Sequence, residues 1–206
     1  MNKTREIFEG IYKKNFWGNS ETVSGPGSTI AYTENIRSEI PKLMKELDLN
    51  SILDGPCGDF NWMKLIIEFT RFQYTGIDIV SELIEKNQVL YGSENIAFIR
   101  KDLLKDELPK SDLMLCRDLL AHLSLEDIHK FFANFVRSQI PYLLTSTHVH
   151  SDLKKNHDIC NGDFRELNLE IPPFRFEPKI RIDDWVAPYP PRQLILLTRE
   201  EVIKFL

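Results

Sequence analysis

From Ser51 onward, the sequence alternates short runs of β-branched and other apolar residues with longer amphipathic stretches. This alternation is typical of βαβ units, in which helices connect parallel strands and cover the sheet. Because each apolar run is short, its strand is expected to be buried on both faces. The pattern therefore predicts an α/β fold with a doubly wound, mostly parallel sheet. The expected strands are 51–54, 72–79, 96–100, 112–117, 142–147 and 193–198, and helices are expected at 61–69, 81–90 and 124–137.

Two regions lie outside this alternation. Residues 1–47 contain two helical stretches, 4–14 and 33–47, separated by a loop rich in Gly, Ser and Pro; we expect them to form an N-terminal helical lid on the sheet domain, residues 48–206. Residues 150–191 are rich in Pro, Asn and Asp, and are expected to form a long loop over one end of the sheet. A chain of 206 residues has room for one structural domain with such additions.

The amino-acid composition limits which classes of partner, such as nucleic acids or membranes, we expect the chain to bind. The 26 Lys and Arg residues are outnumbered by 31 Asp and Glu residues, so the chain has no surplus of positive charge for following a long nucleic acid. The cysteines are isolated, which favours a reducing compartment. The N-terminus lacks the apolar core of a signal peptide, and no apolar run is long enough for a membrane span. We expect a cytoplasmic protein without a membrane partner, and its oligomeric state is left open.

The loop after the first expected strand carries the first functional signal. The strand ends in Asp54, and small residues then lead into a helix, at the place where α/β folds bind nucleotides. Only Gly55 and Gly58 of a GxGxxG dinucleotide pattern are present, so the dehydrogenase pattern is incomplete. The next strand ends in Asp78, about 20 residues further on, where a carboxylate can accept both hydrogen bonds of a ribose diol.

The same residues resemble the first motif of class I S-adenosylmethionine-dependent methyltransferases, a strand ending in an acid followed by x-G-x-G-x-G. Pro56 and Phe60 stand at the first and third glycine positions, and Gly58 keeps the middle one. The resemblance implies a Rossmann-like seven-stranded sheet and S-adenosyl-L-methionine as cofactor. It implies that Asp102 accepts the adenine amino proton. The expected cofactor-binding residues are Asp54, Gly55, Pro56, Cys57, Gly58, Asp78, Ile79, Asp102, Leu103 and Arg117.

The fourth expected strand delivers residues 117–124 to the carboxyl end of the sheet, where ligands of open α/β sheets bind. If this segment is helical, Asp118 and His122 point the same way and can together bind a polar acceptor and remove its proton. An imidazole near its ordinary pKa is largely neutral at cytoplasmic pH and can serve as the base.

This segment also resembles the corresponding part of phosphoethanolamine N-methyltransferases, which contains an R-D-x-x-x-H run, and of small bacterial methyltransferases, some linked to surface-glycan modification. The resemblance implies that Asp118 binds the acceptor and that His122 is the catalytic base. Those phosphobase enzymes also use an N-terminal tyrosine. Tyr12 and Tyr32 are available here, but neither lies in a matching local motif.

Further acceptor contacts are expected near the end of the fifth strand and in the long loop. His148 is expected to line the acceptor pocket as a third catalytic residue, and Arg165, Asn168 and Tyr32 are the expected substrate-binding residues. The pair formed by His148 and His150, with His157, raises the alternative of a metal site. No further pattern supports it, so no metal is expected. Trp17 and the loop 24–28 could close over the ligand as parts of the lid.

These residues predict O-methylation of a small polar acceptor, such as a sugar or a phosphorylated metabolite, with a possible link to surface glycans. Three alternatives stay open. The chain could N-methylate a small amine or phosphobase, or it could bind S-adenosylmethionine without catalysing a reaction. A nicotinamide-dependent oxidoreductase is the third alternative, and it would require binding of a pyridine nucleotide.

Overall fold

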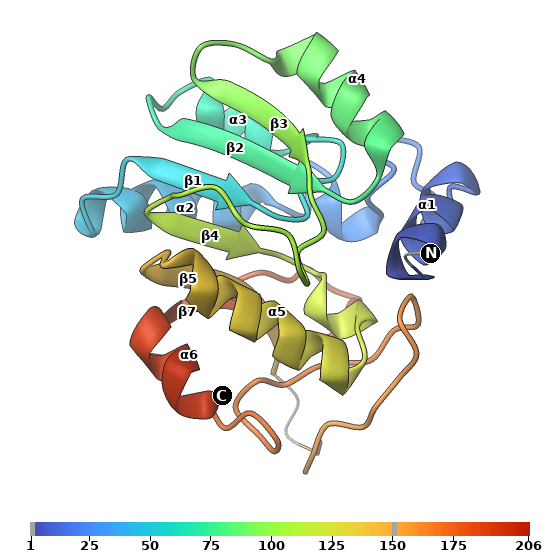
Figure 1. Cartoon of the computed structure of the whole chain (residues 1–206), viewed down its shortest axis with the longest axis vertical. Helices are drawn as coiled ribbons and strands as arrows, with labels where there is room; N and C mark the ends of the chain where they lie inside the picture. Colours follow the sequence, from blue (N-terminus) through green and yellow to red (C-terminus); the bar gives the residue numbers. More distant parts are fainter. Residues whose placement is uncertain (1–2, 150–151) are drawn as a thin grey trace.

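The computed structural model describes residues 3–149 and 152–206 and contains a seven-stranded sheet in the order β3-β2-β1-β4-β5-β7-β6. Strands β1 to β5 run parallel, and β7 lies antiparallel between β5 and β6, as Figure 1 shows in part. The predicted doubly wound, mostly parallel seven-stranded sheet is confirmed. The strands are β1 Ser51–Asp54, β2 Gln73–Asp78, β3 Ile96–Arg100, β4 Leu113–Cys116, β5 Tyr142–His148, β6 Ile180–Asp183 and β7 Arg192–Thr198.

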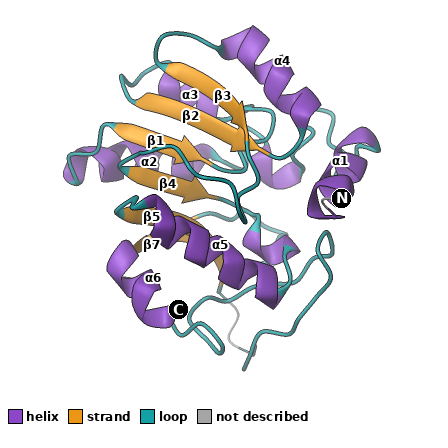
Figure 2. Cartoon of the chain, viewed as in Figure 1, coloured by secondary structure: helices purple, strands orange, loops and turns teal. Residues whose placement is uncertain are grey.

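Helices cover both faces of the sheet (Figure 2). Consecutive residues of the central strands face opposite sides: Leu53 packs into the same core cluster as α5, and Ile52 packs with α2 and α3. Because both faces are buried, the central strands are continuous apolar runs rather than alternating ones. The helices are α1 Lys3–Lys13, α2 Glu34–Glu46, α3 Met63–Ile67, α4 Ser81–Tyr91, α5 Leu125–Ser138 and α6 Arg199–Phe205.

Two local features differ from what the sequence predicts, and one agrees with it. Helix α3 is shorter than the expected 61–69, because Asn61 instead donates hydrogen bonds to Glu21 and to the carbonyl of Ser28. Strand β6 lies inside the expected loop 150–191, where Arg181 and Asp183 interrupt the apolar run that would signal a buried strand. Helix α5 begins within one residue of its expected start, where the Ser124 hydroxyl caps it by accepting a hydrogen bond from the backbone N–H of Asp127.

The N-terminal region divides into two parts. Helix α2 is a covering layer, with four buried apolar residues packed against the sheet. Helix α1 lies beyond the carboxyl ends of β1 and β2 (Figure 1). Only α1 and the following loop are therefore placed to cover a ligand at that edge. Within the described residues, no helix is both long and apolar enough to cross a membrane.

Candidate functional site

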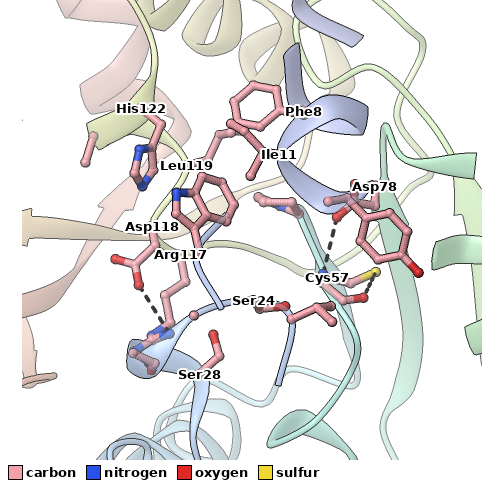
Figure 3. A pocket seen from close by; sticks show the side chains of 18 of the residues that line it. Phe8, Ile11, Ser24, Ser28, Cys57, Asp78, Arg117, Asp118, Leu119 and His122 are labelled. Atoms are coloured by element: carbon pink, nitrogen blue, oxygen red, sulfur yellow. Dashed lines mark hydrogen bonds and ion pairs between the residues drawn. The ribbon is translucent and has the colours of Figure 1, made fainter. Parts of the chain in front are cut away.

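A cavity of about 670 Å³ opens at the carboxyl ends of the central strands. It lies between α1, the loop after β1, the segment after β4 and the N-terminal loop (Figure 3). Its volume is within the range of small-molecule and cofactor sites, roughly 300–1,000 Å³. Asp78 and Cys57 lie on one side of the view in Figure 3, and Asp118 and His122 lie on the other.

The loop after β1 is built around the Asp78 carboxylate. One oxygen of Asp78 accepts a hydrogen bond from the N–H of Gly58 at 3.3 Å, and the other accepts one from the N–H of Val80 at 3.0 Å. Burial raises the pKa of Asp78 to about 6, although these N–H groups partly offset the effect. Gly58 has a φ of +56°, and a Cβ there would lie 2.2 Å from the Ser24 hydroxyl, so a side chain at this position would displace Ser24 as well as strain the backbone.

A second buried carboxylate, Asp54, lines the cavity below this loop. It accepts a hydrogen bond from the Tyr74 hydroxyl at 2.8 Å, and burial raises its pKa to about 7. Pro56, Cys57 and Gly58 also line the cavity, whereas Gly55 does not. A Cβ at Gly55 would lie 2.7 Å from Ile77, so this glycine serves the packing between the loop and β2.

Three further residues of the expected cofactor-binding set come from the ends of β2 and β3. Ile79, Asp102 and Leu103 all line the cavity. Asp102 accepts a hydrogen bond from the N–H of Leu104 at 3.0 Å and pairs with Lys105 at 3.2 Å. These contacts fix the turn that follows β3.

The N-terminal loop is docked onto the loop after β1 by Asp59. The Asp59 carboxylate accepts hydrogen bonds from the Thr22 hydroxyl at 2.8 Å, the Val23 N–H at 2.9 Å and the Ser24 hydroxyl at 3.1 Å. The Ser24 hydroxyl in turn accepts one from the Asp59 N–H. Asp59 was not among the expected site residues, yet it holds the covering loop in place.

The segment after β4 is not an α-helix, so the helical spacing considered for Asp118 and His122 does not apply. Asp118 has a φ of +61°, and only a short 3-10 turn follows, Leu120–His122. The Asp118 N–H donates to the Ser146 hydroxyl at 3.0 Å, which holds this strained turn. Both side chains nevertheless line the cavity.

Asp118 belongs to a group of four charged side chains. Arg192 and Arg117 both pair with its carboxylate, Arg117 at 3.3 Å, and both also pair with the fully buried Asp184. Burial alone would raise the pKa of Asp118, but the two guanidinium charges outweigh it and hold the pKa at about 2. Sequence reasoning missed Arg192 and Asp184, because neither lies in a local motif: Arg192 begins β7 and Asp184 directly follows β6, both far along the chain.

His122 is oriented by its backbone partner. Its Nδ1 lies 2.8 Å from the carbonyl oxygen of Asp163. Because a carbonyl can only accept, Nδ1 carries the proton and Nε2 keeps a free lone pair. The ring packs against Trp17 at 4.9 Å and Phe164 at 5.5 Å between centroids. Burial lowers the pKa of His122 below its ordinary value of 6.5, so the neutral ring is favoured.

His148 has the opposite tautomer. Its Nδ1 accepts a hydrogen bond from the Leu167 N–H at 3.2 Å, so Nε2 carries the proton. Burial lowers the pKa of this ring as well. The cavity is therefore lined by one imidazole with a free acceptor nitrogen and one with a donor N–H.

Arg165 and Asn168, which were expected to bind substrate, do not line the cavity. Arg165 is buried and donates to the carbonyl of Leu123 at 2.6 Å. Asn168 is also buried and donates its N–H to Asn156. The Asn168 side chain is also used internally, because its amide oxygen accepts a hydrogen bond from the Glu170 N–H at 2.8 Å. Tyr32, in contrast, does line the cavity, and its ring lies 5.2 Å from the Arg192 guanidinium.

Comparison with known proteins connects this geometry to a family. No family model matches the chain. It is 32% identical over 132 residues to the phosphoethanolamine N-methyltransferase of Plasmodium falciparum, a match that covers 62% of this chain and 44% of that protein. The chain thus spans less than half the length of this curated relative.

Solved structures that are similar to this chain identify its fold. Magnesium protoporphyrin IX methyltransferase from Synechocystis, solved with bound S-adenosylhomocysteine, superposes with a TM-score of 0.64 at 12% identity, over 95% of this chain and 97% of that one. The 1,6-didemethyltoxoflavin-N1-methyltransferase of Burkholderia thailandensis gives a TM-score of 0.63 at 16% identity, over 94% of this chain and 86% of that one. The chain has the class I methyltransferase fold, and part of it is similar in sequence to a phosphoethanolamine N-methyltransferase.

Within this methyltransferase fold, the metal alternative is not supported by the described residues, which contain no group of three or more potential ligands. His148 lines the cavity and His157 does not. The third member of the predicted group, His150, lies outside the described residues.

Proposed function

We propose that this chain transfers a methyl group from S-adenosylmethionine to a small polar acceptor. The observation that carries the proposal is that one cavity connects two chemically different ends. One end offers the buried carboxylates Asp54 and Asp78, and the other offers His122, His148 and Asp118. The first end suits the cofactor and the second suits the acceptor.

The residues at the first end match the donors of the cofactor. The buried carboxylate of Asp78 accepts hydrogen bonds from two backbone N–H groups. It can accept two more from the hydroxyls of a ribose diol, which would stabilise its charged form. Asp54 and the loop 56–58 are proposed to hold the methionine part, with its ammonium and carboxylate. Ile79, Asp102 and Leu103 are proposed to contact the adenine, and Arg117 to support the covering loop over the cofactor by donating to the Gly27 carbonyl beside Asp118.

The bound cofactor supplies a methyl group on a sulfonium, a good leaving group, so the chain mainly aligns the acceptor and removes a proton. We assign the base to His122, because its Nε2 has a free lone pair at neutral pH. Asp118 is too weak a base, with a pKa of about 2. His148 is placed to donate its Nε2–H to the acceptor oxygen.

The favoured reaction is O-methylation. The C–S bond of the sulfonium breaks as the acceptor oxygen forms a bond to the methyl carbon, and the hydroxyl proton moves to Nε2 of His122. A sugar or a phosphorylated metabolite, with a possible role in surface glycans, is the proposed acceptor class. N-methylation of a phosphobase is the second candidate, because the matched relative from Plasmodium falciparum is named for that activity.

The test is methyl transfer from S-adenosylmethionine carrying a labelled methyl group to a panel of small alcohols, sugars, sugar phosphates and amines. We expect labelled product on oxygen, and a His122→Asn variant that still binds S-adenosylhomocysteine but loses most of the transfer. Product on nitrogen alone would replace the O-methylation assignment. Cofactor binding without transfer to any acceptor would favour the non-catalytic binding module.

A further inference from the structure

The Asp118 carboxylate at the acceptor end is already occupied by the protein itself. One of its oxygens pairs with Arg192, and the other pairs with Arg117 at 3.3 Å. The two arginines also share Asp184, at 2.9 Å for Arg117 and 3.0 Å for Arg192. Two acids and two guanidinium groups together carry no net charge.

This arrangement is rigid. Arg192 begins β7 directly opposite His148 of β5, and its Nε donates to the backbone carbonyl of Asp184 at 3.2 Å. Asp184 is 1% exposed and Arg192 is 8% exposed. Because several bonds and burial hold each group, the arginine is not free to leave Asp118 when an acceptor arrives.

The covering loop closes over the same carboxylate. Arg117 donates to the carbonyl of Gly27 at 2.6 Å, and a Cβ added at Gly27 would lie 3.3 Å from an Asp118 oxygen. Gly27 therefore passes close over Asp118. Asp118 is the most exposed of the three side chains at 31%, but Arg117 and Arg192 line the cavity directly beside it, so a ligand that reaches the carboxylate also meets their charge.

An ammonium acceptor would have to approach two guanidinium groups of its own sign and compete with them for Asp118. A hydroxyl carries no such penalty, and an anionic substituent on the acceptor gains from the arginines. We propose that Arg192 is a specificity-determining residue that occupies Asp118 and thereby selects alcohol acceptors, uncharged or anionic, over ammonium acceptors. This inference rests on the proposed function, and it refines the acceptor class.

The test compares two ligands that differ in charge at the position of the transferred methyl. S-adenosylhomocysteine is uncharged at its sulfur, whereas sinefungin carries a protonated amine at the corresponding place. Isothermal titration of the wild-type protein should show that sinefungin binds no more tightly than S-adenosylhomocysteine. In Arg192→Gln, Asp118 becomes available to the amine, and sinefungin should gain about tenfold over S-adenosylhomocysteine.

The double variant Arg192→Gln/Asp118→Asn is the matched control, and it should lose that gain because the carboxylate is gone. A wild-type protein that prefers sinefungin tenfold or more would overturn the proposal even if the variants fail to fold. An unchanged ratio in a folded Arg192→Gln variant would also overturn it. Failure of the wild-type protein to bind S-adenosylhomocysteine at all would instead contradict the proposed function.

Discussion

Burial moves the pKa values of the cavity's titratable groups in opposite directions, according to the charge that each form carries. It raises the pKa of Asp54 to about 7 and that of Asp78 to about 6, and it lowers the pKa of His122 and His148. In each case the neutral form is favoured, because removing a charge from water costs free energy. Asp118, between two arginines, is held in its charged form instead.

The lowered pKa of His122 predicts the pH dependence of methyl transfer. The ring can accept a proton only when it is neutral, so activity should rise with pH through its pKa and level off above it. Since that pKa lies below 6.5, kcat/KM for an alcohol acceptor should be flat from pH 7 upward and should fall only below about pH 6.5. A profile that still rises steeply between pH 7 and 9 would assign the proton transfer to another group.

The raised pKa values of Asp54 and Asp78 predict that ligand binding depends on pH. The carboxylates accept the cofactor's donors best when ionised, so S-adenosylhomocysteine should bind more tightly at pH 8 than at pH 5.5 and should release protons on binding. Isothermal titration in buffers of different ionisation enthalpy measures that release. Asp78→Asn should weaken binding and reduce the release, and an Asp78→Asn protein that releases as many protons as wild type would contradict this assignment.

At the scale of elements, the functional segments are held by neighbours that carry no functional signal in the sequence. The 3-10 turn with His122 is held by residues 162–165: Gly162 donates to the His122 carbonyl at 2.9 Å, and Arg165 donates from its N–H to the Ala121 carbonyl and from its side chain to the Leu123 carbonyl. Arg165 was expected to bind an anionic acceptor. It is buried behind the turn because three carbonyls at the end of a short turn need donors.

This contact predicts that Arg165 is a positioning residue. Arg165→Met keeps the aliphatic stem but removes the donors to Leu123 and Leu120, so His122 should be held less firmly. We expect kcat to fall about tenfold or more while the Kd of S-adenosylhomocysteine stays within about twofold. Arg137→Met is the matched control, because Arg137 also donates to a backbone carbonyl but is exposed on α5. An equal loss in both variants would indicate a general effect on stability.

The docking of the N-terminal loop gives a prediction for Asp59. Replacing it by alanine removes the acceptor of three hydrogen bonds from Thr22, Val23 and Ser24, so the free energy of unfolding should fall by about 2 kcal/mol. S-adenosylhomocysteine should bind more weakly, and a protease should cut the loop faster. Glu39→Gln, which removes an exposed ion pair with Lys42 on α2, should change none of these. Identical ligand affinity in Asp59→Ala and wild type would contradict the covering role.

At the scale of the whole molecule, the sheet and its carboxyl edge could be predicted from local patterns. Asp54, Asp78 and Asp102 each follow an apolar run, so their places at strand ends were accessible to sequence reasoning, and all three line the cavity. Arg192 and Asp184 could not be found in this way. Arg192 lines the cavity and pairs with Asp184 only because β6 and β7 return to the sheet beside β5, a pairing that no short-range pattern encodes.

The measurement that tests the central claim most directly is isothermal titration of the purified protein with S-adenosylhomocysteine, with NAD as the comparison ligand. S-adenosylhomocysteine should bind at one site per chain, in the cavity between Asp78 and His122. The Asp78→Asn substitution should raise its Kd at least tenfold. The account predicts binding of S-adenosylhomocysteine and none of NAD. Binding of NAD, or no binding of S-adenosylhomocysteine, would contradict it.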